Sequence, residues 1–144
     1  MNRLLFPFLF LANVAFGQME DLHAFIKNNQ PADRICFALY TVHENTLKLT
    51  AQFYPIQNSE PFETVLEVEK EGKWVAVDTA RIIYPGYTAP FRVENWDDTQ
   101  TLKYRVNHNN TAFYEGMIQQ NPINKEELVM ATFSCNSIYP AHGG

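Results

Sequence analysis

The chain has 144 residues, of which 46% are apolar and 14% aromatic, and its formal net charge is −5. This composition is sufficient for a packed core and excludes a disordered chain. Lys and Arg form no run anywhere, which excludes the clustered basic surface that nucleic-acid binding requires. The length allows one domain of ordinary size plus an appendage.

The N-terminus has the three-part pattern of a secretory signal peptide. Residues 1–3 carry one positive charge, residues 4–16 are almost wholly apolar, and Ala15 and Gly17 are the small residues that precede a cleavage site. A membrane anchor is the competing interpretation, but this stretch is shorter than the roughly 20 residues that a spanning helix needs. A buried helix would be disrupted by Pro7. We therefore expect residues 1–17 to be removed, no stable membrane anchor, and export to the periplasm or the extracellular space.

Residues 18–32 form a leader segment before the main domain. Leu22, Phe25 and Ile26 have the spacing of a short helical stripe, which residues 28–31 end. The stripe is too short to be stable alone, so we expect a docked turn or a leader.

Residues 33–120 have the pattern of strands separated by turns. The residues favour seven strands, at 35–42, 46–54, 65–69, 73–83, 91–95, 101–106 and 112–118. Turns recur roughly every 8 to 12 residues, as in an immunoglobulin-like or fibronectin III-like antiparallel β-sandwich. The first strand is apolar on both faces, so we expect it to be covered on both. The fold class is therefore all-β.

The stretch 101–106 alternates most cleanly. Leu102, Tyr104 and Val106 share one face, and Lys103 and Arg105 lie on the other, which is typical of a strand with one buried face. A tyrosine in a late strand, after the acidic turn at 96–98, is typical of the tyrosine corner of immunoglobulin-like sandwiches. An ordinary half-buried tyrosine explains the pattern equally well.

Residues 121–144 begin with a polar linker around Pro122. The following run at 128–133 is apolar with little alternation. It fits an eighth sandwich strand, and it also fits the covered first strand of a following domain.

Cys36 and Cys135 are the only cysteines. We expect no disulfide, because seven up-and-down strands would place them at opposite poles, beyond the roughly 7 Å Cα separation that a bridge tolerates. Cys36 fits a small buried hydrophobe. Cys135 directly follows the apolar run, where its thiolate could bind a metal or act as a nucleophile; an inert thiol is equally compatible.

Other polar and aromatic residues indicate little chemistry by spacing alone. We expect solvated positions for His23, His43 and His108, a solvated strand face for Glu67 and Glu69, and no more than a weak calcium signal from Asp97 and Asp98. Trp74 and Trp96 fit either a sugar-stacking platform or core packing.

Three segments together resemble the N-terminal region of secreted bacterial PhoD-like metallophosphoesterases. They are residues 35–41 (ICFALYT), 93–98 (VENWDD) and 129–137 (VMATFSCNS). In that family a fibronectin- or Ig-like domain precedes a metallophosphatase domain, whose first strand ends in a Gly/Ser-Cys segment that Ser134-Cys135 matches. The resemblance implies that Cys135 is a metal ligand, with iron and calcium as the cofactors of the full-length family.

The resemblance further implies that this chain is a non-catalytic accessory domain, whole or as a truncated fragment, of an exported phosphoesterase. The downstream catalytic domain would be its partner and would bind the phosphoester substrate; residues 121–144 would then be a linker and the start of that α/β domain. Without the other ligands we expect this chain alone to be inactive. The alternative is a stand-alone exported β-sandwich that binds glycans or surface proteins through Trp74, Trp96, Tyr84 or Tyr87.

Overall fold

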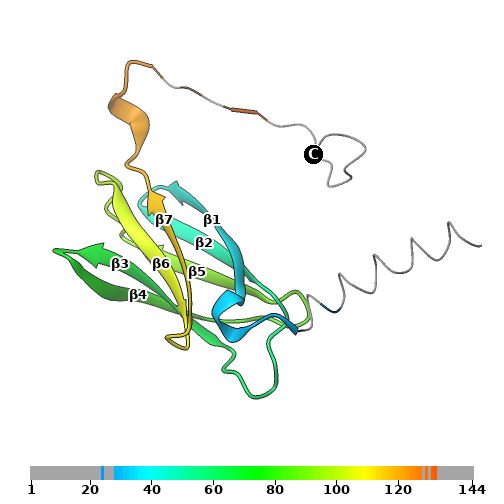
Figure 1. Cartoon of the computed structure of the whole chain (residues 1–144). Helices are drawn as coiled ribbons and strands as arrows, with labels where there is room; N and C mark the ends of the chain where they lie inside the picture. The colour runs from blue at the N-terminus through cyan, green and yellow to red at the C-terminus, as the bar shows by residue number, and fades with distance from the viewer. Residues whose placement is uncertain (1–23, 25–27, 128, 130, 133–144) are drawn as a thin grey trace, which may run out of the picture.

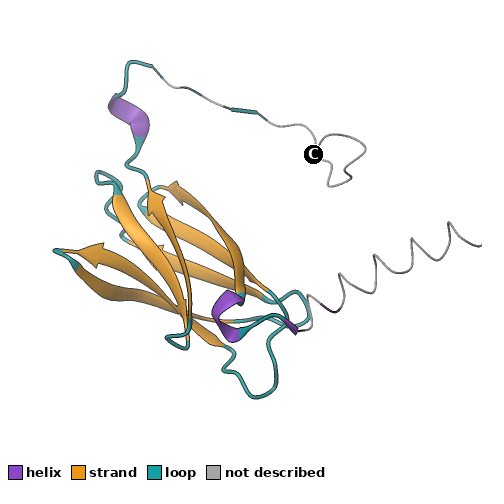
Figure 2. Cartoon of the chain, viewed as in Figure 1, coloured by secondary structure: helices purple, strands orange, loops and turns teal. Residues whose placement is uncertain are grey.

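The computed structural model describes residues 24, 28–127, 129 and 131–132, and these residues form an all-β sandwich of two antiparallel sheets (Figures 1 and 2). The elements in chain order are the 3-10 turn η1 (Pro31–Asp33), strands β1 (Ile35–His43), β2 (Thr46–Phe53), β3 (Glu63–Lys70), β4 (Lys73–Arg81), β5 (Thr88–Glu94), β6 (Leu102–His108) and β7 (Ala112–Ile118), and the 3-10 turn η2 (Pro122–Asn124). The expectation of seven strands in an antiparallel sandwich is confirmed.

The strands divide into a three-stranded sheet in the order β1-β2-β5 and a four-stranded sheet in the order β4-β3-β6-β7. The chain therefore crosses between the sheets after β2, β4 and β5. The expectation of simple up-and-down strands is wrong, because β5 returns to pair with β2 and β6 pairs with β3.

The tight turns in this fold occur where the sequence predicts them. Both residues of the turns 44–45, 71–72 and 109–110 have φ between 47° and 73°. This backbone matches the twist of two-residue hairpins, and Asn and Gly tolerate it best. These three turns fix the register of β1 with β2, of β3 with β4 and of β6 with β7.

The core lies between the sheets and is built from alternate residues of each strand. In β2 the inward residues Leu47, Leu49, Ala51 and Phe53 are at most 2% exposed. Each fully buried Leu or Phe side chain stabilises the fold by about 1.5–3 kcal/mol. Trp96 also lies in this core and is 6% exposed.

Strand β6 places Tyr104 and Val106 in the core and turns Lys103 and Arg105 outward, as the alternation predicts. Tyr104 does not form a tyrosine corner: within the part of the chain that the structure describes, its hydroxyl makes no hydrogen bond. The ring instead lies against Gly116, its partner on β7.

Two expectations about burial are wrong. Strand β1 is an edge strand rather than a covered one, and Phe37 and Leu39 are 45% and 69% exposed. His108 is not a solvated turn residue, because it is 1% exposed, its Nε2 lies 2.8 Å from the Pro61 carbonyl, and its ring packs edge-on against Phe53. His43 is solvated as expected.

The signal peptide (1–17), most of the leader, His23 and Cys135 lie outside the described residues. Of the apolar run 128–133, Val129, Ala131 and Thr132 are described; they belong to no strand, and Val129 is 93% exposed. Within the described residues, no helix has the length and apolar character needed to cross a membrane.

Candidate binding surfaces

The outer side of the four-stranded sheet carries a cluster of aromatic and charged side chains. We call it the Trp74 face and define it as Glu67, Trp74, Lys103, Arg105, Phe113, Glu115 and Met117. The ladder places Glu67 opposite Arg105 and Arg105 opposite Glu115, while Lys103 pairs with Met117. Because side chains of paired residues point to the same side of a sheet, these residues form neighbouring rows.

Arg105 is the centre of the Trp74 face. Its guanidinium carbon lies 4.4 Å from the centroid of the Trp74 ring and 4.8 Å from that of Phe113. Its Nε donates to Glu67 Oε2 at 2.5 Å. A guanidinium so placed is held by cation–π contacts on two rings and by an ion pair, and therefore has little freedom left to lose on binding.

Lys103 extends the cluster along β6. Its Nζ lies 5.2 Å from the centroid of Trp74 and 2.6 Å from Glu115 Oε2. The hydrogen bond to Glu115 is the main influence on the pKa of Lys103 and raises it, so the ammonium stays charged. Two cations thus lie over one tryptophan, with carboxylates beside them.

The edge of the Trp74 face is apolar and accessible. Phe113 and Met117 on β7 are 44% and 45% exposed. These two residues alternate with Glu115, as the period of a strand requires. Phe113 and Arg105 are functional candidates that sequence reasoning did not identify, although the polar–apolar alternation of β6 and β7 contained the signal.

The other aromatic candidates behave differently. Trp96 is buried, so it cannot be an exposed stacking platform; its Nε1 has no hydrogen-bond partner among the described residues. Tyr84 is 71% exposed and meets Tyr87 edge-on with ring centroids 5.7 Å apart, in the turn between β4 and β5. This pair is a second, smaller aromatic surface.

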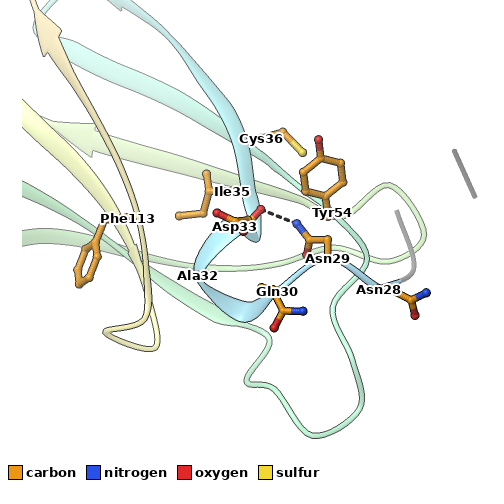
Figure 3. Close-up of a pocket in the computed structure, with 9 residues that line it drawn as sticks. All are labelled: Asn28, Asn29, Gln30, Ala32, Asp33, Ile35, Cys36, Tyr54 and Phe113. Atoms are coloured by element: carbon orange, nitrogen blue, oxygen red, sulfur yellow. Dashed lines mark hydrogen bonds between the residues drawn. The ribbon is translucent and has the colours of Figure 1, made fainter. Parts of the chain in front are cut away.

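A groove of about 620 Å³ lies beside η1 at the start of β1 (Figure 3). Its lining combines amide, carboxylate, thiol, phenol and apolar side chains: Asn28, Asn29, Gln30, Ala32, Asp33, Ile35, Cys36, Tyr54 and Phe113. The Asn29 amide donates to the Asp33 carbonyl at 2.7 Å and so fixes the η1 turn.

Cys36 and Tyr54 point toward one another in this groove (Figure 3). Cys36 is a free cysteine and is half-buried. Burial raises the pKa of the Cys36 thiol, and a hydrogen bond with Tyr54 opposes that rise only in part. The thiol is therefore protonated at neutral pH, which disfavours both nucleophilic attack and metal binding.

A buried ion pair stabilises the wall of the groove. Arg34 is 1% exposed, and its Nε donates to both oxygens of Glu60, at 2.9 and 3.0 Å. Its guanidinium also donates to Asn29 Oδ1. Burial is the largest influence on Glu60 and acts to raise its pKa, but the Arg34 and Gln57 hydrogen bonds and the nearby charges of Arg34 and His108 hold that pKa below its ordinary value.

The acidic candidates are engaged in local structure. Asp97 accepts from the Thr99 hydroxyl at 2.6 Å and from Gln100, and Asp98 accepts from Asn121 at 2.9 Å. Glu67 belongs to the Trp74 face. Among the residues that the structure describes, no group of His, Cys, Asp or Glu side chains could hold a metal ion.

Comparison with known proteins finds no matching family model and no matching curated protein. Among solved structures, the chain is similar to the NEAT5 domain of IsdX2, a B. anthracis hemophore, in complex with heme. The identity is 21% and the TM-score 0.32, over 63% of this chain and 79% of that one.

These comparisons do not support the functional expectation from the sequence, because none of them returned a phosphoesterase. The expectation that this chain is an accessory domain of a PhoD-like phosphoesterase is therefore corrected here and not carried further.

Proposed function

We propose that this chain is an exported β-sandwich module that binds a protein partner through the Trp74 face. Two features support the finer assignments of fold and location. Seven strands in a three-plus-four sandwich, with a chain that crosses between the sheets, favour an immunoglobulin-like or fibronectin III-like domain. The pattern of residues 1–17 favours export.

The observation that carries the proposal is Arg105 held over both Trp74 and Phe113 on a solvent-facing sheet. Trp, Phe, Met and Arg are the residue types enriched at protein–protein interfaces, and Trp and Arg supply most hot spots. The Trp74 face contains all four types within neighbouring rows. Its charges are already paired, so a partner meets a fixed arrangement rather than mobile side chains.

Glycan binding at the Trp74 face is less well supported. A sugar ring stacks on an open aromatic face, but Lys103 and Arg105 already lie over the Trp74 ring. Tyr84 and Tyr87 are the observation that favours glycans instead, since the exposed Tyr84 ring offers an open surface. Glycan binding at this turn is thus the second candidate function.

The test is a side-by-side screen of the labelled protein on an array of extracellular proteins and on a glycan array. Wild type is compared with Trp74→Ala and Arg105→Ala, and with Thr50→Ala on the exposed side of the three-stranded sheet as the matched control. We expect a protein ligand whose binding weakens by about 2 kcal/mol with either substitution on the Trp74 face and is unchanged by Thr50→Ala.

Two results would contradict the proposal. Protein binding that survives both substitutions would move the site away from the Trp74 face. A glycan signal lost with Tyr84→Ala, without any protein ligand, would establish the second candidate. If a variant loses both binding and the circular dichroism spectrum of the folded protein, Arg105→Lys replaces it in the test. This substitution keeps the charge but not the planar stacking.

A further inference from the structure

Strand β1 is an edge strand without the residues that usually protect a sheet edge from pairing. Among the residues that the structure describes, it pairs with β2 and has no strand on its other side, so that side presents unpaired backbone N–H and C=O groups. Proteins normally protect such edges with charged residues or proline. The other three edge strands have them: Lys73, Asp78 and Arg81 on β4, Pro90, Arg92 and Glu94 on β5, and Glu115 on β7. From Ile35 to Val42, β1 has no charged residue and no proline.

The outer face of β1 is apolar as well. Leu39 is 69% exposed, the highest exposure of any large apolar side chain in the seven strands, and Phe37 is 45% exposed. Ala38 points the other way, into the core, and is 7% exposed. No ladder joins β1 and β7, so β7 does not pair with the backbone groups of this edge. The Tyr40 hydroxyl accepts a hydrogen bond from the Gln119 N–H, just after β7.

We propose that β1 pairs antiparallel with β1 of a second copy of this chain, across a two-fold axis, and joins the two three-stranded sheets into one. A row of unpaired backbone groups is a template on which an extended strand can pair. Antiparallel pairing of identical strands satisfies the two-fold symmetry of a closed dimer. An edge without charges brings no like charges together when it meets its own copy, which the charged edges of β4 and β5 would do.

The side chains favour the same arrangement. Directly opposite residues of an antiparallel pair lie on one face, so Phe37, Leu39 and Thr41 of both copies would form one uncharged strip on the outer surface, with the apolar Leu39 at its centre. Packing of Leu39 and Phe37 against their counterparts would reduce the apolar area that these two side chains now expose to water. The dimer leaves the Trp74 face, on the other sheet, open for its own partner.

The first experiment is sedimentation velocity of the protein in the form that an exporting host releases. We expect a dimer that Leu39→Lys dissociates, with the dissociation constant raised at least about tenfold, because two like charges would face each other near the axis. Ile123→Lys, at a 79% exposed apolar position on η2, is the matched control and should leave the dimer intact. Circular dichroism shows whether each variant is folded.

The second experiment is disulfide trapping in a Cys36→Ser, Cys135→Ser background. Single cysteines at positions 37, 39 and 41 are oxidised alone and in pairwise mixtures, with Ile123→Cys as control. We expect at least one β1 combination to give a covalent dimer, since opposite Cα atoms in a ladder lie about 5 Å apart.

Each contrary outcome overturns the proposal. If the protein is monomeric at every concentration at which it is soluble, the proposed dimer does not exist. A dimer unaffected by Leu39→Lys but lost with Trp74→Ala would place self-association on the other sheet. A dimer that traps at no β1 position but disappears on deletion of residues 126–144 would make the C-terminal run, not β1, the occupant of the edge.

Discussion

The Tyr104 ring lies on Gly116, its directly paired residue across β6 and β7. A Cβ atom built on Gly116 would be 2.7 Å from Tyr104 Cε1 and 2.8 Å from its Cζ and hydroxyl oxygen. Tyr104 is 3% exposed and packs edge-on against Tyr40, so the ring cannot simply swing outward. The glycine therefore makes room for the tyrosine, and the two residues act as one packing unit.

We expect Gly116→Ala to destabilise the protein by about 1–3 kcal/mol, because the added methyl group overpacks a buried site. Urea unfolding at neutral pH measures the change. Gly86→Ala is the control, since nothing lies within 4 Å of its Cβ position. A Gly116→Ala variant as stable as wild type would show that the ring moves at little cost.

We expect Glu60→Ala to destabilise the fold by about 3 kcal/mol. The substitution leaves the Arg34 guanidinium charged at 1% exposure without its carboxylate. Glu63→Ala, at an exposed position at the start of β3, should change the free energy of unfolding by no more than about 0.5 kcal/mol. Equal effects of the two substitutions would mean that Arg34 finds another partner.

The same ion pair predicts a pH dependence. Because the pKa of Glu60 is lower in the folded protein than its ordinary value of 4.5, its contribution is fully present above that value and is lost as the pH falls through the folded pKa. The difference in unfolding free energy between wild type and Glu60→Ala should therefore shrink from pH 7 to about pH 3. A constant difference over that range would contradict the prediction.

Tyr104 should limit the stability of the protein at high pH. Burial, with smaller effects of Tyr114 and Tyr40, raises the pKa of Tyr104 from 10.0 to about 12. A raised folded pKa gives stability that is complete below pH 10 and lost as the pH rises through the folded value. Thermal unfolding across this range should show Tyr104→Phe losing less stability than wild type. Tyr84→Phe, at a 71% exposed position, should follow wild type.

Cys36 should be a slow nucleophile. In a Cys135→Ser background, alkylation by iodoacetamide at neutral pH should be slower in the folded protein than in urea, since burial raises the thiol pKa. Tyr54→Phe should slow the reaction further, because it removes the hydrogen bond that lowers this pKa. Faster alkylation of the folded protein would assign Cys36 a reactive role.

The strands and their hairpins followed from the sequence alone. The alternation of 101–106 predicted that Tyr104 and Val106 face the core and that Lys103 and Arg105 face outward. The short gaps between the expected strands, at 43–45, 70–72 and 107–111, predicted where the chain reverses. These features depend on residues close together in the chain, since side-chain period and turn geometry are local properties.

Only the tertiary structure decided which faces are covered and which residues meet. Alternation separates two faces of a strand but does not say what packs on each, so β1 was expected to be covered although Leu39 is 69% exposed. Trp74 and Arg105 lie 31 positions apart on strands that are not adjacent in the sheet, and no spacing in the sequence brings them together. The burial of Trp96, and of His108 at the end of β6, depends on the chain crossing from one sheet to the other between β5 and β6. Such contacts depend on strand order, which the packing of the whole chain determines rather than any one segment.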